Sequence, residues 1–328
     1  MPFASLVGNE RIKKLLKRAV AEGRTGQSLI MAGPRGVGKY RFAQALAQAL
    51  NCERPKDGDA CGVCVPCRKV AAGEHLDVQT AAPEGNFIKV DQIRKFADEA
   101  EFRPFEGRRR VSIIDEADRL NVQAANSILK ILEEPPSTTL FVLVTSKPYA
   151  LLETIRSRCQ MLTFAPLATE ELESHLAKNY KRPADETRLL ARLARGSIGR
   201  ALEIDLGEFR EKRGRMLEMI EALAVARDTV RLMSFAEELG RKLERDEFEN
   251  HLDALLVLLS DLFRLKLGQP HESITNSDIQ PRLLRIAEVT TLEQITDWVE
   301  RIEQILQGLS RNINRQLAIE SFLVLSAE

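Results

Sequence analysis

Long hydrophobic runs and an excess of charge of one sign are both missing from this sequence. No apolar run approaches the roughly 20 residues that a membrane-spanning helix needs, so we expect no membrane span. Lysine and arginine together number 48, and aspartate and glutamate together also number 48. The overall charge therefore does not indicate a nucleic-acid-binding protein, although a local basic patch could still bind DNA. Residues 1–5 lack the pattern of a secretory signal, and we expect a cytoplasmic protein.

Cysteine is scarce, and four of the five cysteines lie in one short segment. Their spacing is C-x8-C-x2-C-x2-C, from Cys52 through Cys61 and Cys64 to Cys67. Almost no large apolar side chain lies between them, so the segment cannot build a core of its own. Four thiolates around one structural Zn²⁺, in a closed tetrahedral site, would hold it together. Disulfides, which are rare in the cytoplasm, and free thiols are the alternatives. The fifth, Cys159, is predicted to be a small buried residue.

A glycine-rich loop stands between a predicted strand and a predicted helix. An apolar run at 28–32 indicates the strand, and a pattern rich in Ala, Leu and Gln at 39–50 indicates the helix. The loop between them reads Gly33-Pro34-Arg35-Gly36-Val37-Gly38-Lys39-Tyr40. Glycines allow a tight turn whose N–H groups point at one anion, and the lysine would reach the outer phosphates. We therefore predict a P-loop fold, with Gly33, Gly36, Gly38 and Lys39 as nucleotide-binding residues.

The position after the lysine lacks the hydroxyl that this loop normally carries. A Ser or Thr there holds Mg²⁺, but this chain has Tyr40. A phenol on a longer and more rigid side chain cannot take that place without rearrangement. ATP and Mg²⁺ are therefore uncertain cofactors of this chain, and a loop that is kept only for its shape is the alternative.

Acidic residues follow a second buried strand. Residues 111–114 lead into Asp115 and Glu116, at the carboxyl end of a strand, where open α/β sheets bind ligands. In a P-loop protein the first acid supports Mg²⁺ and the second can polarise the attacking water. A strand followed by an acidic helix cap is the alternative. Another predicted strand, 140–144, ends at Thr145. In related ATPases a hydroxyl at this place points at the γ-phosphate. An ordinary strand end without such a role is the alternative.

Five predicted strands alternate with helices up to about residue 165, which is typical of a parallel sheet covered on both faces. Asn9 and Thr169 are predicted to cap the helices that follow them, and no Glu or Gln stands three residues after Thr169 to complete a capping box.

From about residue 207 the pattern is purely helical, with three apolar faces that we predict to be core or oligomer contacts. These faces are Leu252, Leu255, Leu256, Leu259 and Phe263; Ile295, Trp298, Ile302, Ile305 and Leu309; and Leu317, Phe322 and Leu323.

Several segments together resemble one family. Besides the cysteine segment they are Ile113-Ile114-Asp115-Glu116-Ala117-Asp118-Arg119-Leu120, Leu129-Lys130-Ile131-Leu132-Glu133-Glu134-Pro135-Pro136 and Thr154-Ile155-Arg156-Ser157-Arg158-Cys159. Over most of its length the chain resembles the delta-prime subunits of the bacterial DNA polymerase III clamp loader. The gamma/tau subunits share the cysteines, the Glu-Glu-Pro-Pro end and the Ser-Arg-Cys triplet. The acidic run up to Asp118, the stretch 144–148 leading into two leucines, and Tyr40 favour delta-prime, because gamma/tau hydrolyses ATP and keeps a hydroxyl after the lysine.

The resemblance implies an architecture. An α/β P-loop AAA+ module would occupy 1–165, with a zinc module at about 52–67. A small helical lid would follow at 166–206. An all-α C-terminal collar at 207–328 would join five subunits in an open ring.

The resemblance also implies roles for two arginines. Arg158 would be an arginine finger that reaches into the ATP site of the neighbouring gamma/tau subunit and stabilises charge on the γ-phosphate. The residues alone would equally allow a solvated surface arginine. Arg200 matches the lid arginine that senses a nucleotide in its own subunit.

The implied function is that of a clamp-loader subunit. Together with gamma/tau and delta it would use ATP to open a sliding clamp and place it on primer-template DNA. This chain would act as a stator that completes a partner's ATPase site, and we do not expect it to be an active ATPase alone. An ATP-hydrolysing, gamma-like motor subunit is the alternative. A zinc-dependent nucleic-acid-binding protein is a third possibility, which the balanced charge disfavours.

Overall fold

The computed structural model describes residues 1–100, 102–309 and 313–327. The chain divides into two compact units. The first contains residues 1–187 and 194–203, and the second contains residues 188–193 and 204–328. Each unit is described by itself below.

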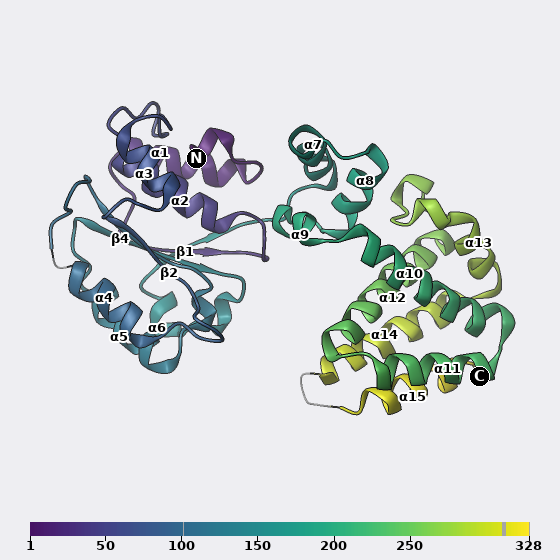
Figure 1. Ribbon diagram of the computed structural model, residues 1–328. Helices are drawn as coiled ribbons and strands as arrows, with labels where there is room; N and C mark the ends of the chain where they lie inside the picture. Colours follow the sequence, from purple (N-terminus) through teal and green to yellow (C-terminus); the bar gives the residue numbers. More distant parts are fainter. Residues whose placement is uncertain (101, 310–312, 328) are drawn as a thin grey trace. The chain divides into compact units, whose positions relative to one another are not determined.

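A five-stranded parallel sheet forms the centre of the first unit (Figure 1). Its strands are β1 (Ser28–Ala32), β2 (Val78–Ala81), β3 (Arg110–Ile114), β4 (Thr139–Thr145) and β5 (Gln160–Thr163), in the order β2-β3-β4-β1-β5. Every residue of β1, β3 and β4 is buried, as is typical of strands in a parallel sheet that is covered on both faces. The predicted parallel sheet is confirmed. The second strand begins at Val78, because the Val78 N–H donates to the His75 carbonyl and closes a turn there.

Helices cover both faces of this sheet (Figure 1). They are α1 (Glu10–Ala21), α2 (Lys39–Asn51), α3 (Val65–Ala72), α4 (Val90–Ala100), α5 (Val122–Glu133) and α6 (Glu153–Arg156). Helices α7 (Thr169–Tyr180) and α9 (Ile198–Glu203) also belong to the first unit but are not part of the two cores that cover the sheet. Successive strand residues point to opposite faces. Accordingly Leu29 and Met31 share a core with α1, α2 and α3, whereas Ile30 and Ala32 share one with α4, α5 and α6. Helix α8 (Ala184–Leu193) contains residues of both units.

Two predicted helix caps are wrong. Asn9 adopts a left-handed conformation with φ of 52° and makes no capping hydrogen bond. Its side chain instead pairs with the backbone of Ala165, whose N–H it accepts at 2.9 Å and to whose carbonyl it donates at 3.1 Å. Helix α7 starts at Thr169 itself, so Ala168 is the flanking residue, and its N–H donates to Glu171 at 3.3 Å.

All regular elements in the described residues of the second unit are helices, and they surround one apolar core. Its helices are α10 (Leu206–Glu221), α11 (Thr229–Glu237), α12 (Arg245–Lys266), α13 (Gln280–Val289), α14 (Leu292–Leu309) and α15 (Arg315–Ala327), with π-helical turns at Ala222–Ala226 and Glu238–Lys242. The predicted face of α14 is buried throughout. Phe263 and Leu317 are exposed, because the buried stripe of α12 continues to Leu262 and that of α15 runs through Ile319 and Phe322. No helix in the described parts of either unit is long and apolar enough to cross a membrane.

Candidate functional site

The glycine-rich loop connects β1 to α2, as the sequence predicts. Gly36 and Gly38 have φ of 72° and 94°, a left-handed region that residues with a Cβ rarely adopt. Gly38 directly precedes the first turn of α2. The loop therefore has the strand–turn–helix setting of a phosphate-binding loop.

Lys39 is buried and turned back onto this loop. Its Nζ donates to the carbonyls of Gly33 and Pro34, both at 2.6 Å. Burial lowers the pKa of Lys39, and the nearby carboxylates of Asp115 and Asp118 oppose that shift. The lysine and the acids that follow β3 thus lie at the same end of the sheet.

The acids and the threonine after β3 and β4 form a small polar network at this end. Burial raises the pKa of Asp115. Glu116 is left-handed, with φ of 48°, and pairs with Arg35 at 3.3 Å. The Thr145 hydroxyl donates to Asp118 Oδ1 at 2.6 Å. The sequence did not predict this role for Asp118, although its place three residues after Asp115 in the acidic run was the available signal.

The start of α9 packs directly on the glycine loop. The Gly199 N–H donates to the Gly36 carbonyl at 2.9 Å, and the Ser197 hydroxyl donates to the Arg35 carbonyl at 2.9 Å. A Cβ at Gly36 would lie 2.3 Å from the Ser197 oxygen. Arg200, which was singled out from the sequence, is therefore adjacent to the loop through its backbone, and the residue is exposed.

Tyr40 has partners of its own at the sheet edge. Its hydroxyl forms a hydrogen bond with Thr80 of β2 at 3.1 Å and accepts one from Gln44 at 3.4 Å. Its ring packs against the apolar core on the α2 side of the sheet. The phenol is thus held by the fold in a position that does not depend on a nucleotide.

Arg158 lies between α6 and the edge strand β5. Its Nη1 donates to the Thr154 carbonyl and its Nη2 donates to Glu133 Oε1, both at 2.9 Å. The residue is exposed. A charged, planar donor is therefore presented at the surface of the first unit.

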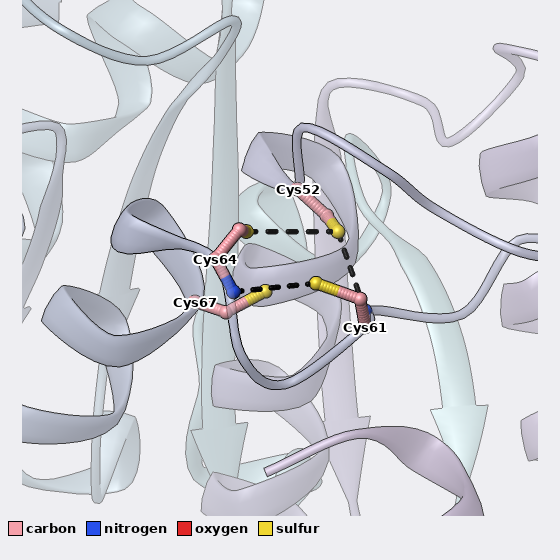
Figure 2. Close-up of side chains that lie close together, drawn as sticks. All are labelled: Cys52, Cys61, Cys64 and Cys67. Atoms are coloured by element: carbon pink, nitrogen blue, oxygen red, sulfur yellow. Dashed lines mark hydrogen bonds between the residues drawn. The ribbon is translucent and has the colours of Figure 1, made fainter.

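The four cysteines of the short segment come together in one cluster (Figure 2). Their sulfur atoms all lie within 4.8 Å of one another, and those of Cys52 and Cys64 are 4.0 Å apart. Four sulfurs bound to one tetrahedral ion at a metal–sulfur distance of roughly 2.3 Å would be about 3.8 Å apart. The N–H of Cys61 donates to the sulfur of Cys52, and that of Cys64 to the sulfur of Cys61. The cluster could hold a metal ion.

The thiols of this cluster differ in their acidity. Burial raises the pKa values of Cys52 and Cys67, whereas the N–H groups of Val63 and Cys64 lower the pKa of Cys61 to about 6. Buried thiols with raised pKa values would stay protonated unless a cation stabilises the thiolates, and a bound divalent ion does so. Cys159 lies apart from the cluster, is half-buried, and has a pKa raised to about 12 by burial.

The cysteine segment is joined to the rest of the first unit by hydrogen bonds. The Asp59 carboxylate accepts the N–H groups of Phe3 and Ala4 at 2.8 Å and 3.0 Å. The Gln48 side chain of α2 donates to the Cys67 carbonyl at 2.5 Å. The cysteine segment therefore contacts both the start of the chain and helix α2 through hydrogen bonds.

Two families match most of the chain between them. Residues 8–168 match the family described as DNA polymerase III, delta subunit, and residues 208–326 match that described as DNA polymerase III, delta subunit, C terminal. The delta' subunit of DNA polymerase III from Bacillus subtilis (strain 168) is 28% identical over 97% of this chain and 96% of that protein. The tau subunit from Escherichia coli (strain K12) is 30% identical over 98% of this chain and 53% of that protein. The chain thus spans about half the length of this second relative.

Among solved structures, a DNA polymerase III gamma-subunit-related protein from Thermotoga maritima resembles the chain with a TM-score of 0.42 and 20% identity. The similarity covers 96% of this chain and 98% of that one.

The delta-type matches extend over both units of the chain, and the delta' relative is matched over nearly its whole length. The parallel sheet with its glycine loop, the four-cysteine cluster and the helical C-terminal region agree with the α/β P-loop AAA+ architecture predicted from the sequence. The chain belongs to the family of DNA polymerase III clamp-loader delta' subunits.

Proposed function

We propose that this chain is a stator of the clamp loader, which completes the ATP site of a neighbouring gamma/tau subunit through Arg158 and does not hydrolyse ATP itself. The observation that supports this most is a contrast within the first unit. Its glycine loop is packed against Ser197 and Gly199, whereas the Arg158 guanidinium is presented at an edge of the sheet. A subunit built in this way would supply the charged Arg158 side chain to the ATP site of its neighbour. It would not hydrolyse ATP at its own glycine loop.

The state of the glycine loop argues against hydrolysis at this chain's own site. Mg²⁺ would lack its hydroxyl ligand, because Tyr40 is hydrogen-bonded to Thr80. Lys39 already donates to two loop carbonyls, so only one of its three N–H donors is left for a phosphate. If a nucleotide binds at all, Gly33, Gly36, Gly38 and Lys39 would hold its phosphates, with Asp115, Glu116, Thr145 and Arg200 around them.

Arg158 suits a role in a partner's site. Its planar guanidinium can bind a phosphate with two parallel N–H bonds. In P-loop enzymes an arginine supplied by a neighbour stabilises the charge that develops on the transferred phosphoryl group. Arg158 would have this role for the γ-phosphate bound to gamma/tau.

The cysteine cluster would hold a structural Zn²⁺. Four thiolates from Cys52, Cys61, Cys64 and Cys67 saturate a tetrahedral ion and leave no open position for chemistry. The buried, clustered sulfurs and the raised thiol pKa values fit such an ion. The ion would stabilise the cysteine segment and, through the hydrogen bonds of that segment, the start of the chain and helix α2.

The proposed partners are the gamma/tau and delta subunits, and through the assembly the sliding clamp and primer-template DNA. Residues 166–206 would form the lid, and residues 207–328 would form the collar that joins the subunits. Co-purification with gamma/tau and delta, followed by ATPase assays of the assembly with and without this chain, tests the proposal. Normal clamp loading by an assembly that lacks this chain would contradict it.

The isolated chain is expected to hydrolyse ATP negligibly, because the Tyr40 hydroxyl after Lys39 is bonded to Thr80 and cannot take the place of a Ser or Thr ligand of Mg²⁺. The measurement is steady-state ATP turnover by the purified chain, with Tyr40→Phe and Tyr40→Thr as paired variants. The phenylalanine variant loses the Thr80 hydrogen bond without gaining a Mg²⁺ ligand, so only the threonine variant can gain nucleotide binding. Turnover by the unaltered chain near the ~1 s⁻¹ lower end of typical enzymes would instead support the gamma-like motor.

A further inference from the structure

The Arg158 guanidinium is already paired with a carboxylate of its own chain. Nη2 donates to Glu133 Oε1 at 2.9 Å, and Nη1 donates to the Thr154 carbonyl at 2.9 Å. The Glu133 side chain is 51% exposed and that of Arg158 is 35% exposed. Two of the guanidinium's N–H groups are therefore engaged, on a surface that a partner could still reach.

The stability of helix α5 does not explain why a carboxylate stands at this position. Glu133 is the last residue of α5, directly after the buried Leu132. The negative end of a helix dipole disfavours an acidic side chain there. An exposed ion pair also contributes little to folding. The pair with Arg158 is thus better explained by an effect on the arginine than by an effect on the helix.

We propose that Glu133 is a positioning residue for Arg158, one that holds the guanidinium and competes with the γ-phosphate of the neighbouring subunit for it. This inference rests on the proposed function of Arg158. A carboxylate and a phosphate offer the same kind of acceptor to an arginine. A phosphate that approaches Arg158 therefore meets a second negative charge, and the arginine transfers its Nη2 hydrogen bond from Glu133 to the phosphate.

Glu133→Gln separates the charge of this side chain from its shape. Glutamine keeps an oxygen that accepts from Nη2, but it does not repel a phosphate. At the gamma/tau ATP site that Arg158 would complete, the ATP concentration that gives the half-maximal rate is therefore expected to fall about two- to fivefold. This range corresponds to the free energy of one exposed ion pair. The maximal rate at that site is expected to stay unchanged, because Arg158 itself is retained.

The experiment uses the reconstituted clamp loader with the full chain. ATP hydrolysis is measured against ATP concentration in the presence of primed DNA and clamp. The difference between the unaltered complex and the Arg158→Ala complex isolates the site that Arg158 serves. Glu134→Gln is the matched control, since Glu134 is the next residue, is exposed and carries the same charge.

The double variant Glu133→Gln with Arg158→Ala provides the decisive comparison. If Glu133 acts through Arg158, Glu133→Gln lowers the half-maximal ATP concentration only when Arg158 is present, and Glu134→Gln does not lower it. An unchanged half-maximal concentration, or an equal change with and without Arg158, overturns the role of Glu133 and leaves that of Arg158 standing. If Arg158→Ala itself has no effect on the rate, the proposed function fails and this inference fails with it.

Discussion

Arg158→Ala is expected to remove nearly all ATP hydrolysis at one site of the reconstituted clamp loader. In other P-loop enzymes an arginine finger accounts for roughly 10³–10⁵ in rate. The loss for the whole assembly should be partial, because the other gamma/tau sites would have fingers of their own. Arg158→Lys should not restore the rate fully, since an ammonium group cannot reproduce the planar fork of donors. The measurement is DNA-stimulated ATPase activity and clamp loading at saturating ATP.

The folding of this chain should be insensitive to the same change. Arg158 is exposed and its ion pair with Glu133 is at the surface, where such pairs contribute about 0–1 kcal/mol. Arg18→Ala is a matched control, because Arg18 is an exposed arginine of the same unit that pairs with Glu22 at 2.7 Å. Equal ATPase rates for the Arg158→Ala and Arg18→Ala complexes, with normal assembly, would show that Arg158 is an ordinary surface residue.

Removal of the proposed zinc is expected to destabilise the first unit severely and to leave the second folded. Structural zinc contributes roughly 10–16 kcal/mol in small zinc domains, which is comparable to the whole stability of a typical domain, about 5–15 kcal/mol. Cys52, Cys64 and Cys67 belong to the same core as Phe3 and Leu46. Loss of the ion would therefore disturb the start of the chain and helix α2, as well as the cysteine segment.

Cys64→Ser tests this expectation together with its control, Cys159→Ser. Elemental analysis of the purified chain should find one zinc per molecule, which Cys64→Ser should lose and Cys159→Ser should retain. Thermal unfolding should show a transition that moves to lower temperature in Cys64→Ser or on chelation, and a second that does not move. Protein without metal, prepared under reducing and chelator-free conditions, would contradict the zinc site.

Much of the first unit follows from local sequence. The apolar run at 28–32 is β1 from end to end, and a short run of consecutive buried residues is typical of a strand covered on both faces. The helix after the glycine loop was predicted to within one residue of its observed end at Asn51. The cap at Asn9 was predicted wrongly, since its side chain bonds with Ala165, 156 residues further along the chain. A local cap and a distant partner compete for the same side chain, and local sequence shows only the first.

The sequence by itself determined the parallel sheet, the glycine loop, the cysteine cluster and the family of this protein. Each of these depends on residue type and on spacing within a short segment: glycine where φ is positive, thiols at fixed intervals, and apolar runs of strand length. Only the tertiary structure decided how these parts meet. Ser197 and Gly199 lie on the glycine loop, the Tyr40 hydroxyl is held by Thr80, and Glu133 pairs with Arg158. These contacts join segments between 25 and 163 residues apart, and they form because helices and strands pack in one particular arrangement, which no local pattern encodes.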